Sequence, residues 1–176
     1  MFLSLFLAAA ILLAFERIAY VWVWRYPRSF TALCALFSKE AQAPVVILER
    51  MFNCFKLIQI SVFLAWCYFH PNQPPWMSGN IVPLTTGATL LIVGQVLNLS
   101  VFYRLGSVGV FYGNRFGFEV PWCTEFPFSL MDHPQYVGAL LSIWGLFLAL
   151  QFPRPDWYAI PALETLYYAL GAYLEH

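Results

Sequence analysis

The side chains that could do chemistry gather in one stretch of this chain, residues 103–135, and at Glu175. The stretch opens with a loop in which glycine recurs, and glycine lets a backbone approach a ligand closely. Groups that hold cations or transfer protons follow the glycines. They are Glu119, Glu125, Asp132 and His133. Such residue types support the binding of a small polar or charged ligand, with proton transfer to or from it.

Each of these residues also has a purely structural explanation. Asp132 suits the N-cap of a helix, and Pro134 suits its first turn. Glu119 and Glu125 could simply face water. The combination favours a site, because the glycine loop, the acids and the histidine are all expected to border one membrane face, to which Glu175 returns.

The composition requires that this site be built in a membrane. Of the 176 residues, 61% are hydrophobic and only 10% are charged, whereas soluble domains carry about 25% charged residues. So much apolar surface also excludes intrinsic disorder. Nine basic and nine acidic residues cancel, so nothing indicates a nucleic-acid partner. Four scattered cysteines and three distant histidines predict neither a disulfide framework nor a metal site.

Five apolar segments must position the polar stretch, since about 20 apolar residues span the hydrocarbon of a bilayer. The segments are residues 2–22, 45–69, 81–103, 136–150 and 157–174. We predict a single all-α domain, residues 1–176, that forms a polytopic integral membrane protein with four to five membrane helices. The last two segments are expected to form a helical hairpin around a tip that contains two prolines.

The first segment allows three interpretations. No basic residue precedes its apolar run, and its first charges, Glu16 and Arg17, come behind that run. We therefore interpret it as a retained membrane helix with an aromatic belt at residues 20–26. A cleaved signal peptide and a re-entrant helix are the alternatives.

Basic residues orient the predicted helices, because cytoplasmic loops carry an excess of Lys and Arg. If the segments alternate, eight of the nine basic residues fall on one side, and Arg154 alone falls on the other. The eight are Arg17, Arg25, Arg28, Lys39, Arg50, Lys56, Arg104 and Arg115. We therefore predict a lumenal N-terminus, a cytosolic loop at residues 104–135 and a cytosolic C-terminus.

Three motifs and one carboxylate resemble those of a known family. They are YGNRFG at residues 112–117, PWCTEFPF at 121–128, HPQYVG at 133–138, and Glu175. Over residues 87–176, the core motif region, the chain resembles the phospholipid methyltransferase family, which is related to the isoprenylcysteine carboxyl methyltransferases. It is most similar to the short, plant-type members, which act on already monomethylated phosphatidylethanolamine.

The resemblance implies S-adenosylmethionine as cofactor. It implies N-methylation of phosphatidyl-N-methylethanolamine, and of its dimethyl form, toward phosphatidylcholine. The implied cofactor site comprises Ile92, Val93, Gly94, Asn114, Pro121, Trp122, Cys123, Thr124, His133, Pro134, Tyr136, Glu175 and His176. Two positions depart from the family pattern: Ile92 replaces the first glycine of a Gly-x-Gly motif, and His176 stands where an acidic residue is frequent.

Methyl transfer to an amine requires that the donor and the acceptor be aligned, and the acceptor ammonium must first lose a proton. We expect the proton acceptor among Glu125, Asp132, His133 and Glu119, in that order of preference. The expected substrate-binding residues are Arg104 and Arg115, either of which would hold the lipid phosphate, and Tyr112 and Trp122, whose rings attract cations. The lipid is expected to reach the site sideways between helices, with its acyl chains in the bilayer.

Two other functions stay open at this point. Carboxyl methylation of a prenylated cysteine uses the same architecture, although that branch normally has a basic residue where this chain has Asp132. A non-enzymatic protein that packs helices or binds lipid would use the glycines and aromatic residues for packing alone. The resemblance implies an integral protein of the endoplasmic reticulum membrane, and the distribution of basic residues predicts that its active site faces the cytosol. The expected partners are the bilayer and a phospholipid substrate, and the oligomeric state is left open.

Overall fold

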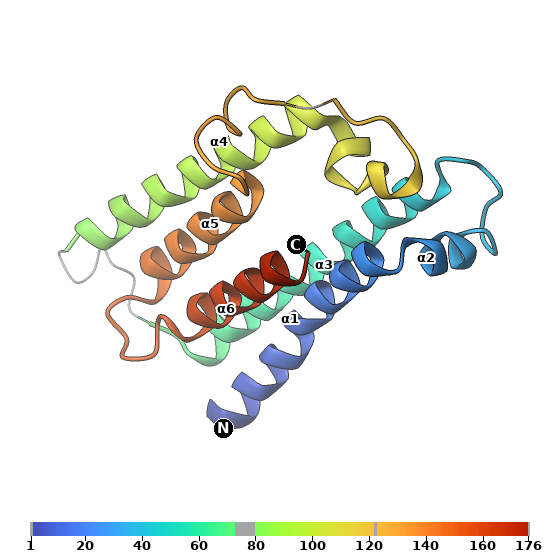
Figure 1. Cartoon of the computed structure of the whole chain (residues 1–176). Helices are drawn as coiled ribbons and strands as arrows, with labels where there is room; N and C mark the ends of the chain where they lie inside the picture. The colour runs from blue at the N-terminus through green and yellow to red at the C-terminus, as the bar shows by residue number, and fades with distance from the viewer. Residues whose placement is uncertain (1, 73–79, 122, 176) are drawn as a thin grey trace.

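Helices make up the regular structure of this chain in a computed structural model, which describes residues 2–72, 80–121 and 123–175. No strand occurs in these residues. In chain order, the elements are α1 (Phe2–Arg25), α2 (Pro27–Cys34), α3 (Ala43–Phe69), α4 (Val82–Val110), the 3-10 helix η2 (Gly113–Phe116), α5 (Pro134–Gln151) and α6 (Ala159–Leu174) (Figure 1). The predicted all-α fold is confirmed.

Four of these helices, α1, α3, α4 and α5, are long and apolar enough to cross a membrane. The 16 residues of α6 fall below the length of about 20 that a full crossing needs. The number of membrane helices therefore agrees with the predicted four to five. α5 and α6 form the predicted hairpin, in which the Trp144 indole of α5 donates a hydrogen bond of 3.0 Å to the Thr165 hydroxyl of α6.

The chain runs alternately between two ends of the molecule through α1, α3, α4, α5 and α6 (Figure 1). At one end, the Arg25 side chain, on the last residue of α1, donates to the carbonyl oxygen of Leu174, on the last residue of α6. At the other end, the Asn72 amide donates to the carbonyl oxygens of Gln151 and Phe152, 3.0 Å from each. This alternation is the one that the orientation argument assumed.

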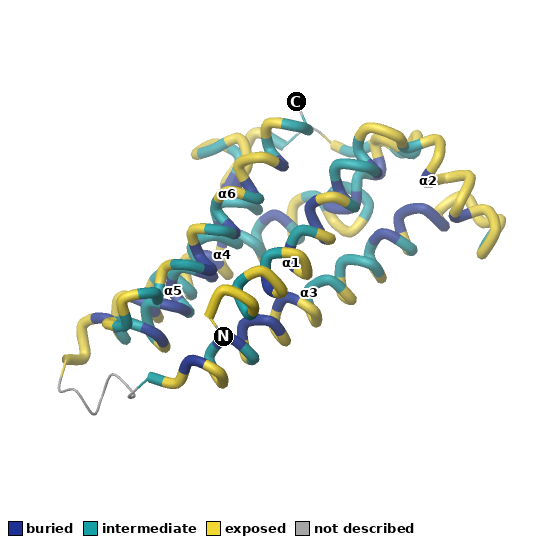
Figure 2. The backbone as a smooth tube through the Cα atoms, turned by 90° about the horizontal axis from the view of Figure 1, so that it is seen from below, coloured by how far each residue is buried: buried dark blue, intermediate teal, exposed yellow. Residues whose placement is uncertain are grey.

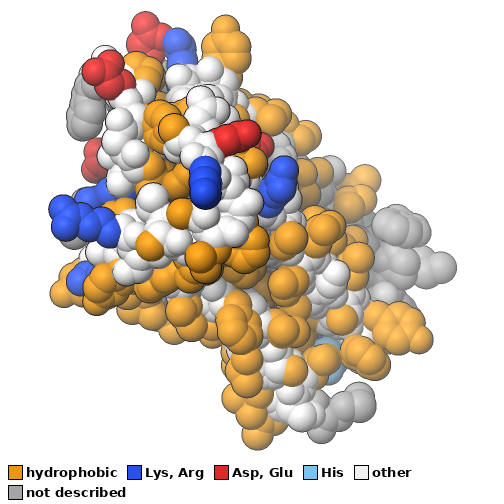
Figure 3. Space-filling view, turned by 90° about the vertical axis from the view of Figure 1, so that its right-hand side faces the viewer, with side chains coloured by type: hydrophobic (Ala, Val, Ile, Leu, Met, Phe, Trp, Pro, Cys, Tyr) orange, Lys and Arg blue, Asp and Glu red, His pale blue; other side chains and the backbone are white. Residues whose placement is uncertain are grey.

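Charged side chains gather toward one end, and hydrophobic side chains cover most of the remaining surface in the view of Figure 3. Two of the eight basic residues assigned to that end lie elsewhere. Arg17 precedes the end of α1 by eight residues, and Lys56 follows the start of α3 by thirteen. At a rise of 1.5 Å per residue, both lie well inside the bundle.

Two local features differ from the sequence prediction. The short helix α2 was not predicted; it begins at a proline, which suits a first helical position, and it buries Phe30 and Cys34 on one face. The fourth helix continues past residue 103 to Val110, with a kink at Gly106, where φ is 61°. Glycine adopts this left-handed conformation without the steric cost of a Cβ atom, so the glycine-rich stretch partly extends the helix.

α4 and α5 pack closely along glycines. A Cβ atom on Gly87 of α4 would lie 2.5 Å from the carbonyl oxygen of Gly145 on α5. Gly94 of α4 and Gly138 of α5 are in similarly close contact about two helical turns further along the pair. Small residues at such positions let helix backbones approach closely in a membrane. α4 and α5 therefore form one tight pair.

α1, α3 and α6 form a second group, in which the Tyr167 hydroxyl of α6 donates to the Ala10 carbonyl oxygen of α1 at 2.9 Å. The buried side chains of Trp66 on α3, Phe147 on α5 and Ile160 on α6 contribute to one core that connects the two groups. Figure 2 shows buried residues along the inward faces of the helices and exposed residues along their outer faces.

Candidate active site

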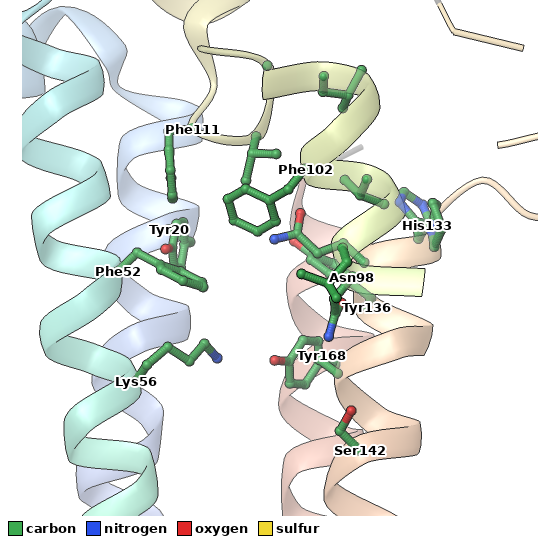
Figure 4. Close-up of a pocket in the computed structure, with 18 of the residues that line it drawn as sticks. Tyr20, Phe52, Lys56, Asn98, Phe102, Phe111, His133, Tyr136, Ser142 and Tyr168 are labelled. Atoms are coloured by element: carbon green, nitrogen blue, oxygen red, sulfur yellow. The ribbon is translucent and has the colours of Figure 1, made fainter. Parts of the chain in front are cut away.

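A cavity of about 1180 Å³ lies between the α1–α3–α6 group and the α4–α5 pair. Sites for drug-sized ligands usually measure about 300–1,000 Å³, so this cavity has room for more than one small molecule. Its lining comes from five helices, from residues between α4 and α5, and from Glu175. Figure 4 shows side chains from both groups facing each other across it.

The Glu175 carboxylate is held by two tyrosines. Glu175 directly follows the last residue of α6. The hydroxyl of Tyr136, in the first turn of α5, donates to Oε2 at 2.5 Å, and the hydroxyl of Tyr112 donates to Oε1 at 3.0 Å. Each carboxylate oxygen thus accepts one phenolic hydrogen bond. The arrangement fixes the orientation of an acidic group at the cavity wall.

Tyr112, which binds Glu175, has an unusual backbone conformation. It is the one non-glycine residue with a positive φ, 57°, in the described part of the chain, and it stands at the N-cap of η2. Non-glycine residues in this conformation cost about 1–3 kcal/mol and cluster at functional sites. Edge-on contacts with the rings of Tyr20 and Trp24, at centroid distances of 5.8 and 5.2 Å, pack the Tyr112 ring.

The segment between η2 and α5 supplies most of the remaining predicted residues. His133 lies nearly parallel to Tyr136, at a centroid distance of 5.7 Å and an angle of 20°. The predicted site residues that line the cavity, in addition to Tyr112 and Glu175, are Asn114, Pro121, Cys123, Thr124, Asp132, His133, Pro134 and Tyr136. The structure therefore brings two of the four predicted proton acceptors and most of the predicted cofactor residues to one cavity.

Three predicted cofactor residues lie outside the lining. Gly94 is buried at the contact between α4 and α5, and the side chains of Ile92 and Val93 are exposed on the outer surface of α4. Because α5 occupies the face of α4 that carries Gly94, a ligand in the cavity contacts other residues of this helix. Two further predicted cofactor residues, Trp122 and His176, lie outside the described residues.

Three predicted catalytic or substrate-binding residues also have other partners. The guanidinium of Arg104 forms a salt bridge of 2.6 Å with Glu125 and donates to the Phe126 carbonyl oxygen. The guanidinium of Arg115 stacks 3.6 Å from the centroid of the Trp24 ring. Neither arginine lines the cavity, nor does Glu125. Their assigned roles stay predictions that the geometry leaves without support.

The structure adds a buried polar network to the cavity wall that the sequence analysis did not include in the site. Lys56 of α3 contacts a Glu16 carboxylate oxygen of α1 at 3.0 Å, and the same oxygen accepts a hydrogen bond of 2.7 Å from Arg17. Lys56 also donates to the Gln59 amide oxygen at 3.0 Å, and Gln59 donates to Glu164 at 2.7 Å. Ionisable residues within apolar membrane segments are usually functional, and this signal could have identified them.

Comparison with protein families matches residues 82–175 to the phospholipid methyltransferase family, which is more than half of the chain. A phosphatidyl-N-methylethanolamine N-methyltransferase of Arabidopsis thaliana is 33% identical over 149 residues, 80% of this chain and 76% of that protein. The chain belongs to the phospholipid methyltransferase family. A phosphatidylethanolamine N-methyltransferase of Mus musculus is 28% identical over 173 residues, 97% of this chain and 83% of its own.

A shorter match, to a phosphatidyl-N-methylethanolamine N-methyltransferase of Schizosaccharomyces pombe, is 42% identical over 73 residues, 40% of this chain and 37% of that protein. No solved structure matches the chain significantly. The family match of this phospholipid methyltransferase begins in α4 and ends at Glu175. It therefore includes Tyr112, His133 and Tyr136, whereas Arg17 and Lys56 come before it.

Proposed function

We propose that this protein transfers methyl groups from S-adenosylmethionine to phosphatidyl-N-methylethanolamine and to its dimethyl form, toward phosphatidylcholine. The main observation in support is the cavity, whose lining includes residues of the family motifs and the Glu175 carboxylate that two tyrosines bind. Relatives that match most of this chain bear names of phospholipid N-methyltransferases. The chain has the membrane helices that a lipid substrate requires.

The cavity residues fit the cofactor. The fixed carboxylate of Glu175 would accept hydrogen bonds from a ribose hydroxyl or an ammonium group, and the rings of Tyr112 and Tyr136 beside it attract cations. When bound, S-adenosylmethionine supplies an electrophilic methyl group on a sulfonium. Asn114 and Thr124 add polar side chains to the same wall.

Before it attacks, the acceptor amine must give up a proton. Asp132 and His133 line the cavity and are exposed enough to pass a proton on to water. Glu125 is paired with Arg104 outside the lining. We therefore assign the proton acceptor to Asp132 or His133. These residues, together with Tyr136, would orient the amine toward the methyl group, which is the main contribution that positioning makes.

The lipid would reach this site between α3 and α4. Ile60 of α3 and Leu99 of α4 line the cavity, and both are also more than half exposed on the outer surface. The cavity thus opens to the side that bilayer lipid covers. A headgroup that enters there leaves its acyl chains among the lipid-facing side chains, so the apolar part of the substrate stays in the membrane.

We further propose that the protein resides in the endoplasmic reticulum membrane with Glu175 near the cytosolic face. After Arg17 and Lys56 are excluded as interior residues, the six other cations assigned to that end still outnumber Arg154 at the opposite end. This excess is typical of cytosolic ends. A glycosylation acceptor inserted into the tip between α5 and α6 tests the orientation, since only a lumenal tip becomes glycosylated.

Purified protein in phospholipid micelles tests the activity. Labelled S-adenosylmethionine should convert phosphatidyl-N-methylethanolamine to its dimethyl and trimethyl forms. Glu175→Ala should weaken cofactor binding by at least tenfold, whereas Glu40→Ala, an exposed carboxylate before α3, should leave it unchanged. Methylation of a prenylcysteine in place of the lipid would establish the carboxyl methyltransferase alternative. Stabilisation of the protein against heat by S-adenosylmethionine would exclude the non-enzymatic alternative.

A further inference from the structure

We infer that Arg17 and Lys56 bind the phosphate of the lipid substrate, an inference that rests on the proposed function. A phosphodiester carries one negative charge, and a charge that moves from water into an apolar cavity needs cationic hydrogen-bond donors. Among the described residues that line the cavity, Arg17 and Lys56 are the only Lys or Arg side chains. Arg17 and Lys56 are therefore the side chains best suited to bind the phosphate of the substrate.

The Lys56 ammonium lies at the cavity wall within the ion-pair cluster. It contacts the two Glu16 carboxylate oxygens at 3.0 and 3.4 Å and the Gln59 amide oxygen at 3.0 Å. Its side chain is 27% exposed, the most exposed member of this ion-pair cluster. Figure 4 shows Lys56 extending from α3 into the cavity, toward Tyr168 of α6. An oxyanion in the cavity can thus approach the exposed part of the Lys56 side chain.

The Arg17 guanidinium has an N–H donor that no hydrogen-bond acceptor of the described residues meets. Its Nη2 donates to Glu16, but its buried Nε has no hydrogen-bond partner. The group lies 3.9 Å from the centroid of the Tyr168 ring, which fixes its plane. A guanidinium has five N–H donors arranged to meet two oxygens of a phosphate at once. Glu16 is the acid that the ion pairs of the described residues place in direct contact with both cations, whereas Glu164 binds Gln59.

The location of the pair suits a substrate whose amine is two carbons away from its phosphate. Arg17 lies 5.7 Å from the centroid of the Tyr136 ring, and the hydroxyl of that same tyrosine binds Glu175. A phosphate on Arg17 and Lys56 therefore directs the attached amine along Tyr136 toward the proposed cofactor carboxylate. Ile60, one turn after Lys56 on α3, borders the opening through which the acyl chains would leave.

A purely structural role explains these contacts less well. A Lys or Arg at the centre of a membrane helix costs about 2.5–3.5 kcal/mol on insertion scales. An apolar side chain would join α1 to α3 without that cost. Glu164, the other buried acid of the network, binds Gln59 and is 1% exposed, away from the cavity. The two cations, in contrast, both border the cavity.

Kinetics of Lys56→Met measure the inferred contact. Losing a charge-assisted hydrogen bond should raise KM for phosphatidyl-N-methylethanolamine by about tenfold to a hundredfold. The affinity for S-adenosylhomocysteine, measured by calorimetry, should stay within twofold of wild type. Lys56→Arg should restore most of the lipid KM. Lys39→Met removes the other lysine of the chain, which is exposed and does not line the cavity, and should change neither constant.

A lipid without the phosphate separates charge recognition from general damage. We would use a diacylglycerol ester that carries an N-methylaminoethyl group but no phosphate. Wild type should use the phosphate lipid at least tenfold better in kcat/KM, and Lys56→Met should lose this preference. The same loss is expected for Arg17→Gln.

Chemical labelling tests the inference in the wild-type protein, so it does not depend on whether a variant folds. A membrane-permeant acetylating reagent can modify both lysines, Lys39 and Lys56. Phosphatidyl-N-methylethanolamine should slow acetylation of Lys56 and not of Lys39, and the phosphate-free lipid should protect neither.

Three results would overturn the inference. The first is an unchanged KM for the lipid in Lys56→Met. The second is a loss of cofactor affinity in Lys56→Met without a rise in the lipid KM, which would mean that the cations bind the carboxylate of the cofactor. The third is a rise in the lipid KM from Arg104→Met that equals the rise from Lys56→Met. None of them affects the proposed function, which fails only if wild type does not methylate the lipid.

Discussion

The two hydrogen bonds to Glu175 give a graded prediction for cofactor binding. Tyr136→Phe and Tyr112→Phe each remove one donor and keep the ring. A hydrogen bond to a charged group contributes about 1.5–3 kcal/mol when it is buried. Because Glu175 is partly exposed, we assign about 1.5 kcal/mol, the lower end of this range, to the 2.5 Å hydrogen bond from Tyr136. This corresponds to about a tenfold loss of affinity.

Tyr112 donates over 3.0 Å, a distance typical of an ordinary hydrogen bond of about 1 kcal/mol. Tyr112→Phe should therefore weaken cofactor binding by only about fivefold. The double variant should lose less than the product of the two effects, because both tyrosines orient one carboxylate. Calorimetric titration of the detergent-purified protein with S-adenosylhomocysteine measures all three affinities.

Tyr167→Phe is the matched control. Its hydroxyl donates to the Ala10 carbonyl oxygen at 2.9 Å, and the residue does not line the cavity. This variant should lower thermal stability and leave cofactor affinity unchanged. Wild-type affinity in both single variants, or a larger effect from Tyr112→Phe than from Tyr136→Phe, would refute the assignment of Glu175 as a tyrosine-fixed cofactor ligand.

Three further predictions concern stability, each measured by thermal unfolding in detergent. Gln59→Leu should cost about 1–3 kcal/mol, because it removes the amide that donates to the buried Glu164; an unchanged melting temperature would argue against this contact. Gly87→Val should cost a similar amount, since a Cβ atom there would meet α5, and tolerance would mean that the pair is less tight. The Arg154 guanidinium holds the pKa of Asp156, in the tip between α5 and α6, below its ordinary value. The contribution of this ion pair to stability should be complete above about pH 4 and disappear as the pH falls through the lowered pKa of Asp156. Asp156→Asn should abolish this pH dependence, and a variant whose stability falls in acid as the wild type's does would contradict the prediction.

The sequence predicts the helices well because long apolar runs leave few alternatives in a membrane. The family resemblance also names His133, Tyr136 and Glu175 together, and these three residues line one cavity; their role in cofactor binding stays a prediction. The sequence does not predict which side chains the family motifs leave outside. Arg104 and Glu125 look available in sequence, yet they bind each other across 21 residues. Such a pairing depends on how the loop folds back, which local patterns do not specify.

The interior cations were missed for a different physical reason. Arg17 and Lys56 lie near charged neighbours in sequence, which suggests helix ends at an interface. α1 continues for eight residues past Arg17, however, so its guanidinium lies about two turns inside the helix end. An almost uniformly apolar helix also has no polar stripe to indicate its inward face. Only the packing of α1 against α3 and α6 identifies that face.

The Glu16–Arg17–Lys56 cluster also affects how the chain enters the bilayer. Glu16 and Arg17 are adjacent on α1 and neutralise each other within one helix, whereas Lys56 on α3 meets its carboxylate only across the helix boundary. An isolated α3 thus carries an uncompensated cation into the hydrocarbon, at about 2.5–3.5 kcal/mol. We expect α3 to integrate efficiently only beside α1, so Glu16→Gln should reduce the insertion of α3 during synthesis. In this protein, the order in which α1 and α3 enter the membrane would depend on the same residues that line the cavity.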